Sequence, residues 1–272
     1  MNERGGPSVL AIVCTRNESV HVTRCVRDLI DEGIDVVLID NESTDDTVAK
    51  ARPFLGKGLR AIETMPWRGV FSLSEQLRRK AAIAAAAPHD WIMHADADEG
   101  FEAPPGLGAM RAALETVQTA GYNCVNFRQF VFVPLHDENF TFDGYADVMR
   151  TYYFFEPRRP HFMRAWRREL AAHLPEHGGH VLQGPGVRLF PDDFAMRHYI
   201  TLSERHAIEK YCERRFSDDD LAKGWHGNRL AIGSTAFRLE PRPELRTLAA
   251  PRSRAYDASA PQRTHYWEWP AL

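Results

Sequence analysis

Cysteine, long apolar runs and blocks of like charge are all scarce in this sequence. The four cysteines, Cys14, Cys25, Cys124 and Cys212, lie far apart and form no CxxC pair. They therefore indicate neither a zinc site nor a disulfide framework. No apolar run approaches the roughly 18 residues that a membrane-spanning helix needs. The formal charge of −3 is spread along 272 residues, which argues against a nucleic-acid-binding protein with a basic face.

The first residues also lack the pattern of a secretory signal. Residues 1–7, MNERGGP, do not place an apolar stretch after a basic one, as a signal peptide would. We therefore expect a cytoplasmic protein with reduced thiols and no integral membrane segment. Hydrophobic residues make up 44% of the chain, which suffices for one large α/β domain or a domain with an appended lobe.

Over residues 8–122 the sequence alternates between short apolar runs and helical patterns. Four runs predict buried strands: residues 9–13, 36–39, 59–64 and 91–95. Four intervening segments predict helices: residues 19–32, 44–54, 72–87 and 105–119. The alternation predicts a mostly parallel sheet with helices on both faces.

Local signals mark where some of these helices begin and end. Gly33 can end the first helix with a left-handed cap. Ser43 or Thr44 can cap the second helix. Residues 72–75, SLSE, have the spacing of a capping box at the start of the third.

The second half of the chain changes character. Residues 123–133 and 146–155 predict strands, one of them antiparallel at the sheet edge, whereas residues 156–186 show little periodicity. A strand at 194–200 precedes a helix that Ser203 opens and that runs to about residue 216. We expect one catalytic domain at 1–235, with halves at 8–122 and 123–235, and an extended or disordered tail at 236–272.

Polar clusters follow three of the predicted parallel strands, at residues 15–18, 40–45 and 96–99. Ligands of an open parallel sheet bind at the carboxyl ends of its strands. Carboxylates gathered there repel one another unless a cation or a donor-rich ligand binds between them. Mg²⁺ and Mn²⁺ prefer such oxygen ligands and leave positions for phosphate and water.

The Asp96-Ala97-Asp98 segment is the strongest candidate for a cation site. If the segment is extended, Asp96 and Asp98 point the same way, so that Asp98 can bind the ion while Asp96 reaches a ribose hydroxyl or a bound water. A DxD motif alone is a weak signal, because acidic turns are common.

Three motifs together carry a resemblance to a known family. The order CTRNE at 14–18, DNESTDDT at 40–47 and HADADE at 94–99 resembles the donor half of glycosyltransferase family 2. That family has Asn-Glu after its first strand, D-[ND]-x-S-x-D after the second and D-x-D-[DE] after the fourth. The resemblance covers about residues 8–100. The segments GGH at 178–180, RHY at 197–199 and GWH at 224–226 resemble a bacterial subgroup.

The resemblance implies a GT-A-like fold and the transfer of a sugar from a nucleotide-diphosphate sugar to a hydroxyl acceptor, with inversion and with Mn²⁺ or Mg²⁺. UDP is the favoured nucleotide, with GDP and dTDP open. Thr15, Asn17 and Glu18 would line the base-and-ribose pocket. Asp40 would accept a hydrogen bond from the ring N–H of a uracil-like base.

The same resemblance assigns the turn and the metal ligands. Ser43 and Asp45 would shape the second motif, or cap the helix after it. Asp96 would lie at the ribose and Asp98 on the metal. Glu42 stands where the family most often has Gly. This departure could alter the turn, although a glutamate is tolerated there if its φ is negative.

The remaining roles fall in the second half. His198 is expected as a further metal ligand, with His226 in reserve. Inversion needs a general base for the acceptor hydroxyl, for which we choose Glu176, with His180 and Asp143 as alternatives.

Basic and aromatic residues could meet the phosphates and cover the donor. Arg68 and Arg79 are candidates for the phosphates, and Lys223 and Arg229 for a closing loop with Trp225 over the donor. Each of these charges can equally be a solvated surface residue.

Three other functions compete with this interpretation. A phosphatase of the haloacid-dehalogenase type places its DxD on the first strand, whereas here it follows the fourth. A nucleotidyltransferase normally has a Gly-rich first loop, and residues 14–18 contain no Gly. A non-catalytic nucleotide-binding scaffold would bind without turnover. The acceptor stays open between a cell-wall or capsule glycan, a small natural product and a protein side chain.

Overall fold

The computed structural model describes residues 6–173 and 179–270. The chain forms two compact units, each built from separate stretches of sequence. The first unit comprises the described residues within 1–67, 73–127 and 160–196, and the second those within 68–72, 128–159 and 197–272. The chain crosses between the units near residues 68, 73, 128, 160 and 197, and the boundary expected at residue 122 stays a prediction.

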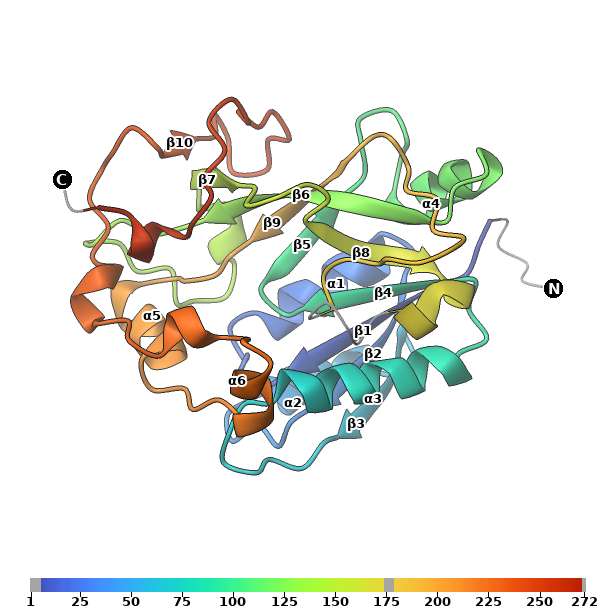
Figure 1. The fold of residues 1–272 in the computed structure, drawn as a ribbon, viewed down its shortest axis with the longest axis horizontal. Coiled ribbons are helices and arrows are strands. Elements are labelled where there is room, and N and C mark those ends of the chain that lie inside the picture. The colour runs from blue at the N-terminus through green and yellow to red at the C-terminus, as the bar shows by residue number, and fades with distance from the viewer. Residues whose placement is uncertain (1–5, 174–178, 271–272) are drawn as a thin grey trace. The chain divides into compact units, whose positions relative to one another are not determined.

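Four parallel strands form the centre of the first unit, as the apolar runs predict. They are adjacent in the order β3-β2-β1-β4 (Figure 1). Their bounds are β1 Val9–Thr15, β2 Asp35–Asp40, β3 Leu59–Thr64 and β4 Trp91–Asp96. The predicted mostly parallel α/β fold is confirmed.

Two antiparallel strands extend this sheet beyond β4. Strand β8 (Phe162–Arg167) pairs with β4, and the first residues of β6 (Cys124–Phe132) pair with β8. The sequence analysis missed β8, because it lies in a stretch rich in Pro, Arg and His without a clear apolar period. A further short strand, β5 (Glu99–Glu102), pairs with β9 (Phe194–His198).

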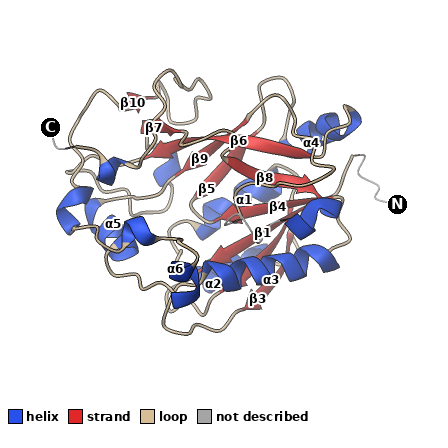
Figure 2. Ribbon diagram, viewed as in Figure 1, coloured by secondary structure: helices blue, strands red, loops and turns tan. Residues whose placement is uncertain are grey.

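Helices lie on both faces of the parallel strands (Figure 2), and alternate residues of β1 pack toward opposite faces. On one face, Val9, Ala11 and Val13 join the core with helices α1 and α4. On the other face, Leu10 and Ile12 pack near α3. The helices of this unit are α1 Val22–Asp31, α2 Thr47–Ala51, α3 Leu73–Ala86 and α4 Met110–Thr119, with 3-10 turns at Arg52–Phe54 and Arg168–His173.

Three helix boundaries test the local signals. Gly33 adopts φ +80 and ends α1, as predicted. The predicted cap of the second helix is wrong, because α2 begins after Asp46 and shows no side-chain cap. Helix α4 begins at Met110 rather than near 105, because Gly106 and Gly108 both adopt positive φ before it.

The second unit is built on the end of β6. Residues Gln129–Phe132 pair with β7 (Thr151–Phe155), and β7 pairs with β10 (Arg246–Thr247). Ser203 caps its main helix as predicted, although the helix ends at Tyr211. Its helices are α5 Glu204–Tyr211 and α6 Asp218–Ala222, with 3-10 turns at Tyr145–Asp147, Gly227–Arg229, Ser234–Phe237 and Tyr266–Glu268.

The described part of the C-terminal tail consists mainly of turns and irregular segments, and several of its side chains are buried. Phe237, Leu239, Tyr266 and Trp267 are buried in the core of the second unit. Within the described residues, no helix combines the length and the apolar character that crossing a bilayer requires.

Candidate functional site

The ends of three parallel strands bring the predicted polar clusters together in the first unit. In the sheet register Thr15 lies beside Asp40, and Cys14 lies beside Asp96. The loops that follow β1, β2 and β4 therefore start next to one another. The predicted meeting of the three clusters at one sheet edge is confirmed.

Hydrogen bonds tie the loop after β1 to the loop after β2. The Asn17 N–H donates to Ser43 Oγ at 2.9 Å, and Asn17 Oδ1 accepts from the Thr44 N–H at 2.8 Å. Thr15 is buried and its hydroxyl donates to the Ile39 carbonyl at 3.4 Å. In this structure Thr15, Asn17 and Ser43 hold the shape of the loops, and their predicted contacts with a nucleotide stay predictions.

Asp45 and Thr47 make the next set of ties. Asp45 accepts hydrogen bonds from the Thr47 hydroxyl, the Thr47 N–H and the Ser19 N–H. Thr47 Oγ1 accepts from the Glu18 N–H at 2.8 Å. Partial burial would raise the pKa of Asp45, but the hydrogen bonds from Thr47 and Ser19 outweigh it and lower the pKa below 3.8. Asp45 is thus a charged acceptor at the start of α2.

One carboxylate oxygen of Asp40 accepts no hydrogen bond. The residue is 6% exposed, and its Oδ2 accepts from the Ser43 N–H at 3.1 Å. Its Oδ1 is buried with no hydrogen-bond partner. Buried carboxylate oxygens are rarely left without a donor, so this atom fits the predicted role of accepting an N–H from a bound base.

Glu42 departs from the expected backbone. Its φ is +51, a left-handed conformation that a residue with a Cβ adopts at a cost, so the condition of a negative φ is not met. The conformation is supported from both sides: Glu42 Oε2 accepts from the Trp67 N–H at 2.9 Å, and the Glu42 carbonyl accepts from Arg16. The Arg16 guanidinium lies 3.8 Å from the centre of the Trp67 ring.

The DxD segment is a turn and not an extended strand. Asp96 is the last residue of β4, Ala97 and Asp98 form the turn, and Glu99 begins β5. The premise that an extended backbone aligns the two carboxylates is therefore wrong. Asp98 is 6% exposed, whereas the side chain of Asp96 is 44% exposed.

Buried cations that the sequence analysis missed surround this turn. Lys80 Nζ of α3 lies 3.4 Å from Asp96 Oδ1, and Arg164 Nη2 of β8 lies 3.2 Å from Asp96 Oδ2. Arg164 also pairs with Glu99, which is fully buried as a side chain. Nearby carboxylates raise the pKa of Arg164 against the effect of its burial. The carboxylates at this edge are thus partly balanced by the protein itself.

The predicted histidine ligands lie in the second unit. His198 ends β9, and its Nδ1 is hydrogen-bonded to Gln129. His226 stacks on Phe216 with 4.6 Å between ring centres. Burial lowers the pKa of His226 to about 4, and Arg229 adds to the shift. His226 is therefore neutral at pH 7, and the metal role of both histidines stays a prediction.

The described residues test whether a divalent cation fits. Across 6–173 and 179–270, no three His, Cys, Asp or Glu side chains are gathered as a ready-made cluster. The donors nearest the turn are carboxylates, which suit Mg²⁺ or Mn²⁺. These ions often bind through one or two carboxylates plus substrate phosphates, so Asp98 at this edge fits that pattern.

The other predicted residues are placed as follows. Arg79 is paired with Glu63 of β3, so its predicted phosphate contact would require breaking that pair. Arg68 is exposed. Glu176 lies outside the described residues. His180 packs edge-on against Phe162 at 4.6 Å, and Asp143 is exposed.

The predicted closing-loop residues lie in the second unit. Lys223 Nζ lies 5.1 Å from the centre of the Trp225 ring, and the Arg229 guanidinium lies 5.4 Å from the centre of the Tyr211 ring. Cation–π contacts of this kind shape the segment from within. The predicted roles of Trp225 and Arg229 at a donor stay predictions.

The sequence matches the family described as "Glycosyl transferase family 2" over residues 10–174. The chain belongs to this family. The matched range contains all three polar clusters of the sheet edge.

Curated relatives named as glycosyltransferases match this chain over a shorter range. An uncharacterized glycosyltransferase of Rickettsia conorii is 31% identical over 99 residues, which are 36% of this chain and 32% of that protein. A second, from Rickettsia felis, is 33% identical over 94 residues, 34% of this chain and 29% of that protein. The matches thus span about a third of the length of these relatives.

The solved structures that resemble this chain are more distant. Staphylococcus aureus TarS gives a TM-score of 0.46 at 10% identity, covering 71% of this chain and 37% of that chain. Glucosyl-3-phosphoglycerate synthase from Mycobacterium tuberculosis, in complex with Mn²⁺, UDP and its product, gives 0.30 at 21%, covering 46% of this chain and 44% of that chain. With TM-scores below 0.5, neither likeness decides anything about the site of this chain.

Proposed function

We propose that this chain transfers a sugar from a nucleotide-diphosphate sugar to a hydroxyl acceptor, with a divalent cation and with inversion at the anomeric carbon. One observation carries the proposal. At the carboxyl ends of the parallel strands, Asp40, a buried carboxylate with an unpartnered oxygen, and the turn that holds Asp96 and Asp98 lie on either side of β1.

Asp40 supports a preference among nucleotides. Its free Oδ1 is an acceptor, so it matches the N3–H of uracil or thymine or the N1–H of guanine. Cytosine has an acceptor at N3, which would face the carboxylate without a proton between them. We therefore expect UDP to bind about 5- to 160-fold more tightly than CDP, because an unpaired buried polar group costs about 1–3 kcal/mol.

Asp96 and Asp98 would serve the ribose and the metal. A bound Mn²⁺ or Mg²⁺ would neutralise the diphosphate and stabilise it as a leaving group. Lys80 and Arg164, which already face Asp96, would keep positive charge at the same edge. Such fixed charges lower the barrier most where the leaving group gains charge.

The acceptor side rests on the family pattern. Glu176 would take the proton of the acceptor hydroxyl, with His180 or Asp143 as alternatives. His198 would complete the metal site, with His226 in reserve. The acceptor is a glycan, a small natural product or a protein side chain.

Thermal unfolding with nucleotides tests the donor site. UDP, GDP, dTDP and CDP are each added with Mn²⁺ or with EDTA to wild type, Asp98→Ala and the control Asp31→Ala, an exposed carboxylate on α1. A ligand at about 100 times its dissociation constant stabilises the fold by about 2.7 kcal/mol, or several degrees. We expect a Mn²⁺-dependent shift with UDP that Asp98→Ala removes and Asp31→Ala retains.

Two outcomes would change the proposal. If no nucleotide shifts the wild type with metal present, the donor site is absent and the glycosyltransferase assignment of the site fails. If UDP-sugars bind but no UDP is released with any acceptor or with water, the chain acts as a nucleotide-binding scaffold. Asp40→Asn gives a sharper test of the base contact, since an amide donor in that place should raise CDP binding relative to UDP.

A further inference from the structure

Arg24 of α1 is a buried arginine that the proposed function does not use. It is 6% exposed. Its Nη2 donates to the carbonyl oxygens of Ala97 at 2.7 Å and Glu99 at 2.8 Å. Its Nη1 lies 3.3 Å from Asp28 Oδ2, one turn further along the helix. A single guanidinium thus joins α1 to both ends of the turn that presents Asp98.

The two carbonyls fix the backbone on either side of Asp98. In a trans peptide the carbonyl and the next N–H point in opposite directions. Because Ala97 and Glu99 direct their carbonyls to Arg24, the N–H groups of Asp98 and Gly100 point away from α1. The peptide before Asp98 and the peptide after Glu99 are both held in one orientation.

Further polar contacts fix the start of the turn. Glu99 Oε2 accepts from the Asp96 N–H at 2.9 Å, while Glu99 Oε1 pairs with Arg164. On the α1 side, Cys25 Sγ lies 3.9 Å from the Asp96 carbonyl. The backbone from Asp96 to Glu99 is therefore held by hydrogen bonds on both sides.

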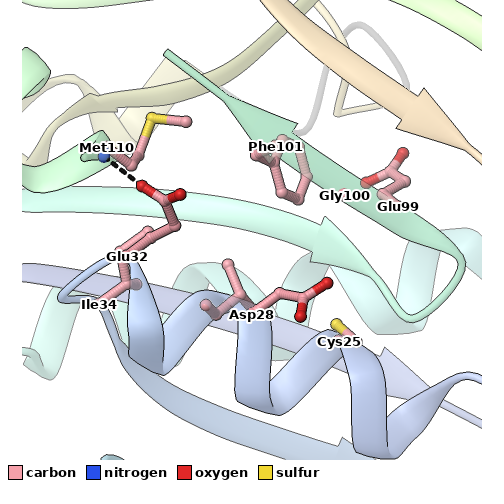
Figure 3. Close-up of a pocket in the computed structure, with 9 residues that line it drawn as sticks. Cys25, Asp28, Glu32, Ile34, Glu99, Gly100, Phe101 and Met110 are labelled. Carbon is pink, nitrogen blue, oxygen red and sulfur yellow. Dashed lines mark hydrogen bonds between the residues drawn. The ribbon is translucent and has the colours of Figure 1, made fainter. Parts of the chain in front are cut away.

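Apolar side chains of α1 and β5 belong to one core cluster but leave a gap between the two elements. A small pocket lies there, lined from α1 by Cys25 and Asp28 and from β5 by Glu99 and Gly100 (Figure 3). The hydrogen bonds of Arg24 connect α1 to the turn next to this pocket. The turn is thus held to α1 both by apolar packing and by the polar contacts of Arg24.

We propose that Arg24 is a positioning residue, which sets the direction of the Asp98 carboxylate before a divalent cation and a diphosphate bind. The inference rests on the proposed function. Arginine suits the role because its planar guanidinium presents several donors in a fixed arrangement, whereas the lysine ammonium is a single point charge on a flexible stem.

Metal coordination makes such positioning matter. Mg²⁺ requires nearly ideal octahedral geometry, so a carboxylate that can tilt away binds it less well. Groups that orient a metal ligand without touching the ion typically change metal affinity by about 10–100-fold when they are removed. A general loss of stability would weaken all ligands together, and this difference separates the two roles.

The test uses Arg24→Lys and Arg24→Met in the full chain, with Arg27→Met as matched control. Arg27 lies on the same helix and also faces Asp28, at 3.7 Å, but it is exposed. The readout is the Mn²⁺ concentration that gives half of the UDP-dependent thermal shift. Binding of uridine, which has no phosphate and needs no metal, is measured by calorimetry alongside.

We expect both Arg24 variants to raise the Mn²⁺ midpoint by about 10–100-fold, with the larger effect in Arg24→Met. Uridine binding should stay within about twofold of wild type, and Arg27→Met should match wild type in both measurements.

Four results would overturn the inference. The first is a folded Arg24→Met with the wild-type Mn²⁺ midpoint. The second is a loss of uridine binding as large as the loss of Mn²⁺ response, which indicates general loosening. The third is failure of both Arg24 variants to fold, which assigns the residue to stability. The fourth is a wild type that does not respond to UDP with Mn²⁺, in which case the proposed function itself fails.

Discussion

Two halves of the same sheet edge are held by different kinds of interaction. The loops after β1 and β2 are joined by hydroxyl, amide and backbone hydrogen bonds, such as those of Asn17 and Ser43. The turn after β4 is held by buried charges, with Arg24 on its carbonyls and Arg164 on its carboxylates. In the half that would meet a base, the contacts described above each have at least one uncharged partner, as when Asp45 accepts from the Ser19 N–H, so we call it the neutral half. In the half that would meet phosphate and metal, buried ion pairs such as Arg164 with Glu99 hold the turn, so we call it the charged half.

The difference has an energetic meaning. A typical neutral hydrogen bond contributes about 0.5–1.5 kcal/mol. Removing one partner of a buried ion pair costs about 3–5 kcal/mol, because the other charge is left uncompensated. The charged half should therefore tolerate substitution less well than the neutral half.

The largest effect is expected from Arg164→Met. The change leaves the buried Glu99 carboxylate without its partner, so we expect the free energy of unfolding to fall by about 3–5 kcal/mol. Urea denaturation measures it. The double variant Arg164→Met with Glu99→Gln should recover a large part of the loss, because the amide keeps an acceptor for the Asp96 N–H. A double variant no more stable than the single one would contradict the ion-pair explanation.

The second-largest expected effect is on how the free energy of unfolding depends on pH, which should differ between the two halves. His94 of β4 is 1% exposed, and burial, together with Lys80 and Arg164, holds its pKa well below 6.5. Below pH 6.5 the unfolded chain then binds one more proton than the folded chain. The free energy of unfolding therefore decreases as the pH is lowered, by up to about 1.4 kcal/mol per pH unit. His94→Phe, whose ring can also pack edge-on against Trp166, should flatten this slope between pH 6.5 and 5.

The neutral half should respond only to stronger acid. Asp45 has a lowered pKa, so its stabilisation is present above its unfolded value of 3.8 and is lost as pH falls through the lower folded value. An Asp45→Asn variant should therefore show the wild-type slope between pH 6.5 and 5. A change of slope in that range would show that the two halves do not titrate separately.

Glu42 offers a test of about 1 kcal/mol within the neutral half. Glu42→Ala loses the hydrogen bond to the Trp67 N–H and keeps the left-handed backbone. Glu42→Gly loses the same bond but removes a conformational cost of about 1–2 kcal/mol. We expect the Gly variant to be the more stable of the two by about 1 kcal/mol in urea denaturation. Equal stabilities would mean that the backbone at this position is not strained.

Ser43→Ala should give the smallest effect. It removes the acceptor of the Asn17 N–H, a partly exposed contact that water can replace. We expect a loss of about 0.5–1 kcal/mol in thermal unfolding. A loss as large as that of Arg164→Met would erase the difference between the halves.

The arrangement of the sheet edge could be predicted from sequence because it depends on local patterns. Each parallel strand is an apolar run, and a polar cluster follows it directly. Once the strands are parallel and adjacent, the clusters at residues 15–18, 40–45 and 96–99 must meet. The order of the strands, which puts β1 between β2 and β4, was supplied by the structure.

The cations of the site could not be predicted in the same way. Lys80 lies in an alanine-rich helix with two other basic residues, and Arg164 lies in a stretch without periodicity. Both look like solvated charges in sequence. Only the packing of α3 and β8 against β4 buries them near Asp96, and that information is tertiary.

Backbone conformation was the other limit. A DxD segment can be extended or form a turn. Here it forms a turn, because the short strand β5 begins directly after it at Glu99. The left-handed φ of Glu42 depends on contacts with Arg16 and Trp67, which are distant in sequence. The residue types were recognisable, but the geometry around them was not.

The position of β8 has a consequence for how the chain folds during synthesis. In the first unit β8 lies between β4 and β6, although β6 precedes it in the sequence. When β6 has left the ribosome during synthesis, β8, the strand that pairs with both β4 and β6, is not yet complete. It becomes available only after residue 167 has also left the ribosome. Until then β4 has an unpaired edge that is exposed to association with other chains. A chaperone that binds exposed strands would act on the nascent chain at this stage.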